Sequence, residues 1–313
     1  MVLSRSRPRP PERFPLSWSI PARAVALALA VHILWGGNPV AVKVGLEAFP
    51  PLTSSFLRFA LGIACVVAWG RIMRIPLAPP REEWPALFWL GLLFIVQIAL
   101  MYAGFAATSA VNGAVLIATN PLFGVLFAHL FVTGDRLTPA RALGAAVAFA
   151  GTMLVLLRGA GAASLAASTD GDLLVLASAG LLGLRLALCG RVLKRVNDVR
   201  LTLWQMAVAL PFFAAGALAF ESVRVEHVGP GPIAGILYQG IVVAGLGFTA
   251  QFHLIRRYTP SVMISFNFVA PVAGVALGAW LLGERVTAPL LGGMLLVAAG
   301  LALIARGPRT RDR

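Results

Sequence analysis

The sequence predicts an all-α integral membrane protein in which ten transmembrane helices form two inverted five-helix repeats. Three observations lead to this prediction. Of the 313 residues, 59% are hydrophobic and only 12% are charged, so a water-soluble domain would lack the polar residues that cover a surface. Ten apolar stretches each approach the roughly 20 residues that span a bilayer. Matching residues also recur about 150 positions apart along the chain.

The ten apolar stretches lie between short turns. The first five run approximately over 24–46, 52–69, 85–105, 111–132 and 139–157, and the second five over 172–193, 201–220, 233–255, 261–282 and 287–305. Connections such as Pro50-Pro51, Thr138-Pro139 and Thr259-Pro260 are short, so consecutive helices are expected to pack as antiparallel neighbours. The stretches are continuously apolar rather than alternating, which disfavours a β-barrel.

The basic residues indicate the orientation in the membrane. The net charge of +14 is spread over short loops, which argues against a nucleic-acid partner. Basic residues are retained on the cytoplasmic side, and with the N-terminus inside, 20 of the 26 Lys and Arg residues fall on that side. We therefore expect a multi-pass protein of the cell inner (plasma) membrane with both termini cytoplasmic. Residues 1–23 would form a basic arm and residues 306–313 a basic tail.

Two proline motifs mark the internal repeat. Asn120-Pro121 precedes Gly124, and Ala270-Pro271 precedes Gly274, 150 positions later. Other residues recur at offsets of 147 to 149: Gly36 with Gly183, Arg58 with Gln205, Gly144 with Gly293 and Gly151 with Gly300. Because each copy holds five helices, an odd number, the second copy enters the membrane upside down. We expect a first repeat at 24–157, a linker at 158–171 and a second repeat at 172–305.

These residues resemble the ten-helix drug/metabolite transporter superfamily, specifically its EamA-type members. The resemblance covers almost the whole chain. It is carried by Trp35-Gly36-Gly37-Asn38-Pro39-Val40-Ala41-Val42-Lys43, by Leu57-Arg58-Phe59-Ala60, and by the Pro121 and Pro271 stretches with their turns Gly134-Asp135-Arg136 and Gly283-Glu284-Arg285. The chain departs from the family at Asp135, where glutamate is usual, which matters little if the carboxylate caps a helix end.

The resemblance and the inverted repeat imply a secondary transporter that moves a small organic metabolite by alternating access. An amino acid or related compound, or a drug-like solute, is the expected substrate, and the resemblance favours export. The acidic residues all map to loops or helix ends, so a proton relay has no evident carrier inside the membrane: Glu47, Asp135, Asp170, Asp172, Asp198, Glu221, Glu226 and Glu284. The solute and the lipid bilayer are the expected partners, while a coupling proton and a homodimer are left open.

Pro121 and Pro271 are the candidate kink and gating residues. Pro121 removes an intrahelical hydrogen bond, which in lipid is tolerated only where other groups satisfy the freed carbonyl, and Thr119 and Asn120 are placed to do so. A passive kink is the simpler interpretation of one proline. Recurrence in both repeats favours paired kinks that shape a central cavity and bend as access alternates, with Gly124 and Gly274 adding room for close packing.

Arg58 is the principal candidate for substrate binding. A cation inside the membrane costs about 2.5 to 3.5 kcal/mol, so Arg58 should face a cavity or a partner. It would be either a structural arginine on helix-end carbonyls or a counter-charge for a carboxylate or phosphate of the substrate. Lys43 is expected to extend toward the outer face, and the depth of Arg185 is left open. The other cavity candidates are Trp35, Asn38, Gln97, Tyr102, Asn120, Gln239 and Asn267, each of which also fits a buried helix contact.

The main alternative is a membrane-embedded enzyme or flippase that acts on lipid-linked substrates. An enzyme would need a nucleophile or base cluster at one membrane face, and the sequence offers none. An ion channel would need rings of like residues in a symmetric assembly. Walker, HExxH and GxSxG motifs are absent, Cys65 and Cys189 have no CxxC spacing, and His32 and His253 are isolated. We therefore expect no catalytic residues, no cofactor and no metal site.

Overall fold

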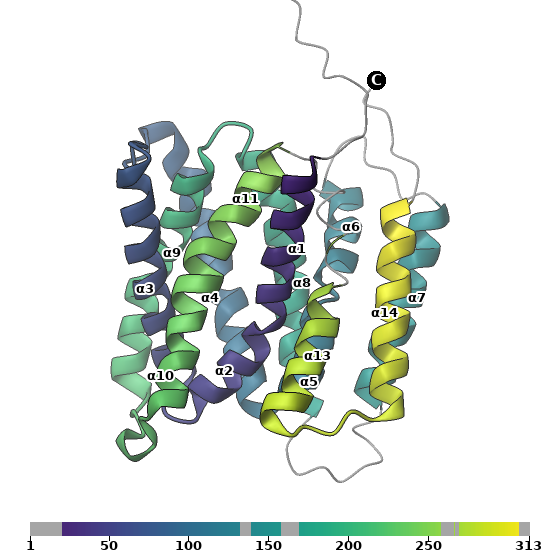
Figure 1. Cartoon of the computed structure of the whole chain (residues 1–313). Coiled ribbons are helices and arrows are strands. Elements are labelled where there is room, and N and C mark those ends of the chain that lie inside the picture. The colour runs from purple at the N-terminus through teal and green to yellow at the C-terminus, as the bar shows by residue number, and fades with distance from the viewer. Residues whose placement is uncertain (1–20, 132–138, 158–168, 258–265, 267–268, 307–313) are drawn as a thin grey trace, which may run out of the picture.

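The computed structural model describes residues 21–131, 139–157, 169–257, 266 and 269–306. Every regular element in these ranges is a helix (Figure 1). The helices stand side by side, and α1 begins at the same end of the bundle at which α14 ends. We call this end the terminal face and the other end the opposite face.

The described elements account for all ten predicted segments. The first repeat contains α1 (Ala22–Gly36), α2 (Asn38–Leu46), α3 (Pro51–Ile72), η1 (Arg81–Glu83), α4 (Trp84–Ala107), α5 (Ala110–Ile117), α6 (Asn120–Phe131) and α7 (Pro139–Leu157). The second contains α8 (Thr169–Val192), α9 (Asp198–Phe220), η3 (Val225–His227), α10 (Pro230–Leu237), the π-helix η4 (Tyr238–Gly247), α11 (Phe248–Arg257), α13 (Val269–Leu282) and α14 (Ala288–Arg306). Six spans are long and apolar enough to cross a membrane, and four shorter apolar helices complete the set. The predicted ten-helix fold is confirmed.

The first segment is interrupted, which the sequence analysis did not anticipate. Residues 24–46 were expected to form one helix, but α1 ends at Gly36 and α2 begins at Asn38. Pro39 occupies the first turn of α2, where its missing N–H would have no intrahelical partner in any case. The carbonyl of Leu34 at the end of α1 accepts hydrogen bonds from the Gly37 N–H (3.1 Å) and the Tyr238 hydroxyl (2.6 Å). The Leu34 carbonyl is therefore satisfied at the interruption.

The fourth segment is also two helices, separated at the predicted proline. Pro121 has no N–H to donate to the carbonyl of Ile117, and the Asn120 side chain donates to that carbonyl instead, at 2.9 Å. The Thr119 hydroxyl donates to the carbonyl of Leu116 at 2.6 Å. Asn120 therefore satisfies the freed carbonyl, as expected, whereas Thr119 bonds a different carbonyl, and the helix is broken rather than kinked.

The second proline motif is only partly described. Pro271 lies in the first turn of α13, which begins at Val269, and a proline is tolerated there because the first turn needs no N–H donor. Asn267 and most of the chain before α13 lie outside the described residues. The expected bend at Pro271 within the segment 261–282 therefore stays a prediction.

The inverted repeat is visible in matched helix contacts. A Cβ atom added at Gly36 in α1 would lie 2.7 Å from the carbonyl oxygen of Ala270 in α13, and one added at Gly183 in α8 would lie 2.5 Å from that of Asn120 in α6. Gly183 follows Gly36 by 147 positions and Ala270 follows Asn120 by 150. Each repeat therefore packs its first helix against the fourth helix of the other repeat, in the same way.

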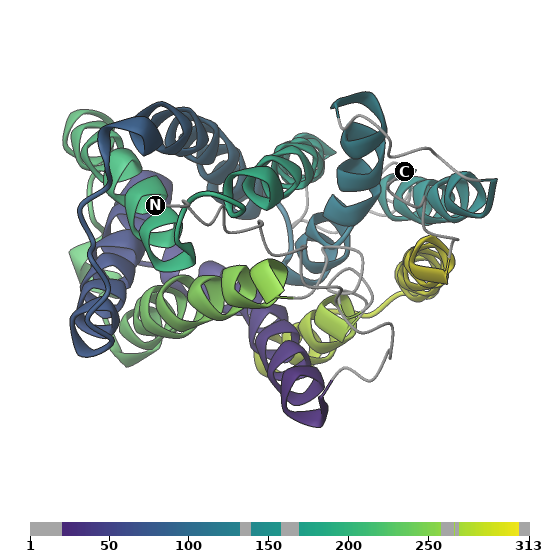
Figure 2. The same ribbon diagram turned by 90° about the horizontal axis from the view of Figure 1, so that it is seen from above.

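The helices α7 and α14 lie side by side at one edge of the bundle (Figure 2). A Cβ atom at Gly151 would lie 2.6 Å from the carbonyl oxygen of Gly293, and one at Gly293 would lie 2.8 Å from that of Gly151. Gly300 approaches the carbonyl oxygen of Gly144 in the same manner. Residue numbers rise along α7 as they fall along α14, so the helices are antiparallel. The repeat matches Gly144 to Gly293 and Gly151 to Gly300, so exchanging the two repeats converts the contact of Gly151 with Gly293 into that of Gly300 with Gly144. The pseudo-two-fold axis therefore passes between these two helices.

The outer surface carries large apolar side chains, as lipid contact requires. Trp280 is 79% exposed, Leu218 88% and Phe220 84%. The interior holds an aromatic centre in which the ring centroid of Phe59 lies 4.8 Å from that of Phe94 and 5.8 Å from that of Phe213. Because Phe59 follows Arg58 directly in α3, this centre lies beside the principal candidate residue.

Candidate functional site

The helix α3 carries Arg58 and is fixed at its start by a carboxylate from the second repeat. Glu221 accepts hydrogen bonds from the backbone N–H groups of Leu52 (2.8 Å) and Thr53 (2.7 Å), and from the Thr53 hydroxyl (2.9 Å). The first N–H groups of a helix lack intrahelical partners, and the helix dipole favours a negative charge there. This cap holds Arg58 about 10 Å along the axis from Pro51, the first residue of α3.

Arg58 begins a chain of hydrogen bonds that links the two repeats. Its side chain is 2% exposed, and its Nη1 donates to the Tyr102 hydroxyl in α4 at 3.4 Å. Tyr102 donates in turn to Oε1 of Gln239 in η4. The Nε2 of Gln239 donates to the carbonyl oxygen of Ala41 in α2 at 2.8 Å. Three of the predicted cavity residues, Arg58, Tyr102 and Gln239, are therefore linked directly.

Aromatic rings cover the guanidinium group of Arg58. Its Cζ lies 5.3 Å from the ring centroid of Phe59 and 5.8 Å from that of Phe248, at the start of α11. A cation is attracted to an aromatic face at such distances. Trp35 meets the Phe248 ring edge-on, with centroids 5.8 Å apart. The predicted residue Trp35 thus belongs to the same cluster, and Phe248, which the sequence analysis missed, connects its members.

Arg185 is a second arginine of this cluster, and it is buried inside the bundle. It is 2% exposed in α8, and its Nη1 donates to Oε1 of Gln205 in α9 at 2.6 Å. Its Cζ lies 4.8 Å from the ring centroid of Phe94 and 5.9 Å from that of Phe248. The repeat offset of 147 matches Arg185 to position 38 and Gln205 to Arg58. Because Gln205 matches Arg58, this offset is the sequence signal that could have placed Gln205, and with it the bonded Arg185, at the candidate site.

Eight buried side-chain atoms in the described part of the chain have no hydrogen-bond partner. A buried polar group without a partner is costly, more so inside a membrane, and a group of them indicates a site that receives polar partners. Six of the residues belong to the cluster or are predicted cavity residues, and only Asn112 and Gln251 do not. The atoms are Trp35 Nε1, Asn38 Oδ1, Arg58 Nε, Gln97 Oε1, Asn112 Oδ1, Arg185 Nε, Gln205 Nε2 and Gln251 Oε1.

Other predicted residues make helix contacts. Gln97 donates to the Ser178 hydroxyl at 3.1 Å, and this hydroxyl donates back to the Gln97 carbonyl at 2.8 Å, which joins α4 to α8. Asn120 serves the helix break, as described above. A Cβ atom at Gly274 would lie 2.7 Å from the Cβ of Ala114, so Gly274 permits close packing of α13 against α5. A Cβ atom at Gly124 would lie 3.7 Å from the carbonyl oxygen of Gly183.

Two charged side chains fasten helices together at the opposite face. Glu284, in the turn after α13, accepts hydrogen bonds from the backbone N–H groups of Ala110 and Val111 at 2.8 Å each, and so caps α5. Lys43 donates to the carbonyl oxygens of Phe105 (3.1 Å) and Thr108 (2.8 Å) at the end of α4. Lys43 therefore reaches toward the opposite face of the bundle rather than toward Arg58.

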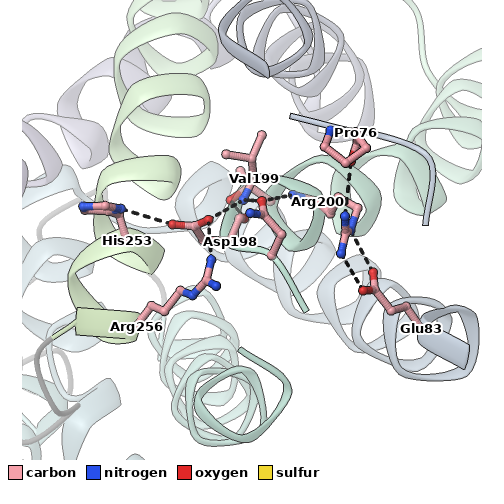
Figure 3. Close-up of polar contacts among 9 residues, drawn as sticks. Pro76, Glu83, Asp198, Val199, Arg200, His253 and Arg256 are labelled. Atoms are coloured by element: carbon pink, nitrogen blue, oxygen red, sulfur yellow. Dashed lines mark hydrogen bonds and ion pairs between the residues drawn. The ribbon is translucent and has the colours of Figure 1, made fainter. Parts of the chain in front are cut away.

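A polar cluster at the terminal face joins α9 to α11 and η1 (Figure 3). Asp198 faces His253 Nδ1 at 3.2 Å and Arg256 Nη1 at 3.4 Å, while Arg200 forms a two-pronged pair with Glu83, at 2.9 and 2.6 Å. These contacts connect helix ends rather than the interior. Among the described residues, His, Cys, Asp and Glu side chains form no group that could hold a metal ion.

Comparison with known proteins agrees with this architecture. The profile of the EamA-like transporter family matches residues 22–157 and again residues 169–306. A protein of Salmonella typhimurium (strain LT2) named probable amino-acid metabolite efflux pump is 28% identical over 301 residues, which cover 91% of this chain and 95% of that protein. The uncharacterized inner membrane transporter YedA of Escherichia coli (strain K12) is 26% identical over 259 residues, 82% of each chain.

One solved crystal structure of a protein has the same fold. It superposes with a TM-score of 0.68 at 23% sequence identity, and the match covers 91% of this chain and 97% of that one. The family profile, with its two consecutive matches, spans most of the sequence. The chain therefore belongs to the EamA-like transporter family and is a multi-pass membrane transporter.

Proposed function

We propose that the protein exports a small organic metabolite across the inner membrane by alternating access, with the solute bound between the two repeats at the cluster around Arg58 and Phe248. The observation that carries the proposal is the chain Arg58, Tyr102 and Gln239, whose members come from both repeats and are buried. An amino acid or related compound, or a drug-like solute, is the substrate class that we expect. The name of the Salmonella relative supports export of such a compound.

Contacts at the opposite face support the alternating-access part of the proposal. The helices α5 and α13 meet through Ala114 and Gly274, and Glu284 bonds the first turn of α5. All of these contacts are non-covalent and join one repeat to the other. Separating the repeats at this face would break them without unfolding a helix, and would expose the cluster to that side.

Transport is tested directly with purified protein in liposomes. We expect flux of at least one solute from a broad metabolite panel to exceed that of protein-free liposomes. A comparison of the metabolites retained by cells with and without the protein then narrows the substrate. Absence of flux above the empty controls across the whole panel would count heavily against the proposal.

The orientation gives a second expected result. A reporter fused after Arg313 should signal a cytoplasmic C-terminus, because 20 of the 26 Lys and Arg residues then lie on the cytoplasmic side. Paired alkaline phosphatase and fluorescent protein fusions make this measurement from either side. An extracytoplasmic signal would reverse the proposed topology.

A third expected result concerns the exposure of Arg58 to water. In a background with Cys65 and Cys189 replaced by alanine, Arg58→Cys should be labelled by a water-soluble thiol reagent, because the solute pathway must reach this position. Transported solute should protect the thiol from labelling. Val66→Cys, two turns further along α3 at a position that is 1% exposed, is the matched control and should remain unlabelled. An Arg58→Cys thiol that no reagent reaches from either side would instead indicate a purely structural arginine.

A further inference from the structure

Two buried arginines from different repeats lie against one aromatic ring. The Cζ atoms of Arg58 and Arg185 are 5.8 and 5.9 Å from the Phe248 centroid, so the two guanidinium carbons are no farther apart than the sum of these distances. Arg58 lies seven residues after Pro51, where α3 begins, and Arg185 lies seven residues before Val192, where α8 ends. Because both helices run from the opposite face to the terminal face, the arginines approach the middle of the membrane from its two sides.

Neither arginine has a counter-charge among the described residues. The ion pairs of the described residues involve other cations, and neither Arg58 nor Arg185 has a carboxylate at ion-pair distance in this part of the chain. Their polar contacts are one hydroxyl and one amide oxygen, both neutral. Aromatic faces offset only a part of the penalty for burying an unpaired cation. The protein therefore maintains two positive charges in its interior.

The two guanidinium groups present the same free edge. Each uses Nη1 for its hydrogen bond to the protein. The Nε of each is buried and has no partner, and neither Nη2 makes a hydrogen bond to the described residues. The Nε and Nη2 groups of an arginine form a planar fork that matches a carboxylate or phosphate with two parallel hydrogen bonds. Each arginine is thus free to bind one acidic group.

We infer that Arg58 and Arg185 form a binding site for a solute with two negative charges, such as a dicarboxylate or a phosphate monoester. This inference rests on the proposed function and narrows its expected substrate class from amino acids, related compounds and drug-like solutes to doubly charged acids. A solute with one carboxylate leaves one buried charge unpaired. A zwitterionic amino acid also brings an ammonium group, which both arginines repel. Two acidic groups neutralise both cations, so doubly charged solutes bind most tightly.

A panel of matched compounds tests this with the full-length protein purified in detergent. The probes are linear dicarboxylates of three to six carbon atoms, their monoamides and diamides, and glycerol phosphate, and the measurement is the rise in unfolding temperature with ligand concentration. We expect a dicarboxylate, or glycerol phosphate, to stabilise the protein at a concentration about tenfold or more below that of the singly charged monoamides. The diamides should have no effect. Comparing the dicarboxylates with glycerol phosphate distinguishes carboxylate from phosphate as the source of the charge.

Two variants separate a binding role from a structural one. Arg58→Met and Arg185→Met should each unfold at the same or a higher temperature than the wild type without ligand, because each removes an unpaired buried charge. Each should also lose the preference for a dicarboxylate over its monoamide. Arg200→Met is the matched control: it removes the partner of Glu83, so it should lower the unfolding temperature and keep the preference. Structural arginines would instead lose stability without ligand.

The wild-type panel decides the inference even where a variant does not fold. Equal stabilisation by dicarboxylates and monoamides, or stabilisation by none of the doubly charged probes, would overturn it. Liposome flux distinguishes it from the proposed function. Flux of zwitterionic or neutral solutes without a preference for doubly charged ones contradicts the inference and leaves transport intact. Binding of a dicarboxylate without flux of any solute supports the site and contradicts transport.

Discussion

Gly183→Ala is expected to destabilise the protein and reduce transport. A Cβ atom at this position would lie 2.5 Å from the carbonyl oxygen of Asn120 and 2.7 Å from the backbone nitrogen of Gly124. Neither is the end of a flexible side chain, so α6 must move away from α8. Overpacking of this kind costs about 1 to 3 kcal/mol, which equals or exceeds the roughly 1 kcal/mol that alanine contributes over glycine in a helix. The unfolding temperature of the purified protein measures the difference.

The matched control is Gly180→Ala, one turn earlier in the same helix. A Cβ atom there would meet nothing closer than the Phe123 ring, at 3.7 Å, which is ordinary van der Waals contact. This variant should therefore unfold at or above the wild-type temperature, because it gains helix propensity without a clash. Equal behaviour of the two variants would mean that the contact between α8 and α6 is not as close as described.

Glu284→Gln is expected to loosen the opposite face. The glutamine keeps the shape of the side chain but replaces one carboxylate oxygen by an NH2 group, which cannot accept a hydrogen bond. One of the two bonds to the first turn of α5 is therefore lost, and the other loses the negative charge that strengthens it. A loss of about 1 to 2 kcal/mol in this contact would shift the ratio of closed to open molecules by roughly 5- to 30-fold. Because the contact joins α13 to α5, transport rates should change together with this ratio.

Labelling of a cysteine at Val111 reports this opening. Val111 is 2% exposed beside the bonds to Glu284, so Val111→Cys in the cysteine-free background should react slowly, and faster once Glu284→Gln is added. Glu226→Gln is the control, since the Glu226 carboxylate is 71% exposed and faces only His227, at 3.5 Å. Equal labelling of Val111→Cys with and without Glu284→Gln would show that this carboxylate does not hold the face closed.

The ten helices and their repeat could be predicted because both depend on local composition and on spacing along the chain. Continuous apolar runs indicate membrane spans, and glycine pairs such as Gly151 and Gly300 indicate the offset between the two repeats. The interruption at Gly37 was not predicted from Pro39, because the matching position of the other repeat, Leu186, is not a proline. Pro121, which has such a counterpart, was identified together with Asn120, the side chain that satisfies its freed carbonyl.

The candidate site was predicted only in part, because contacts depend on how each helix is rotated. A helix that is apolar on every side gives no periodicity from which to read its buried face. Arg58 was identified by its charge alone. Its contact with Tyr102 depends on how α3 and α4 are rotated about their axes. The contact of Arg185 with Gln205 depends likewise on the rotation of α8 and α9. The cap of α5 by Glu284 joins residues 173 and 174 positions apart, a separation that no local pattern encodes.

The glycine contact between α7 and α14 has a consequence for the origin of the chain. The pair Gly151 and Gly293 and the pair Gly144 and Gly300 exchange under the pseudo-two-fold axis, so the contact is isologous, the kind that two identical subunits make. Two copies of a single five-helix polypeptide, inserted in opposite orientations, would form the same contact. The architecture is therefore what duplication and fusion of a gene for such a dual-topology dimer would produce. Fusion then allows the two halves to diverge, as the arginine at position 58 in one half and at position 185 in the other illustrates.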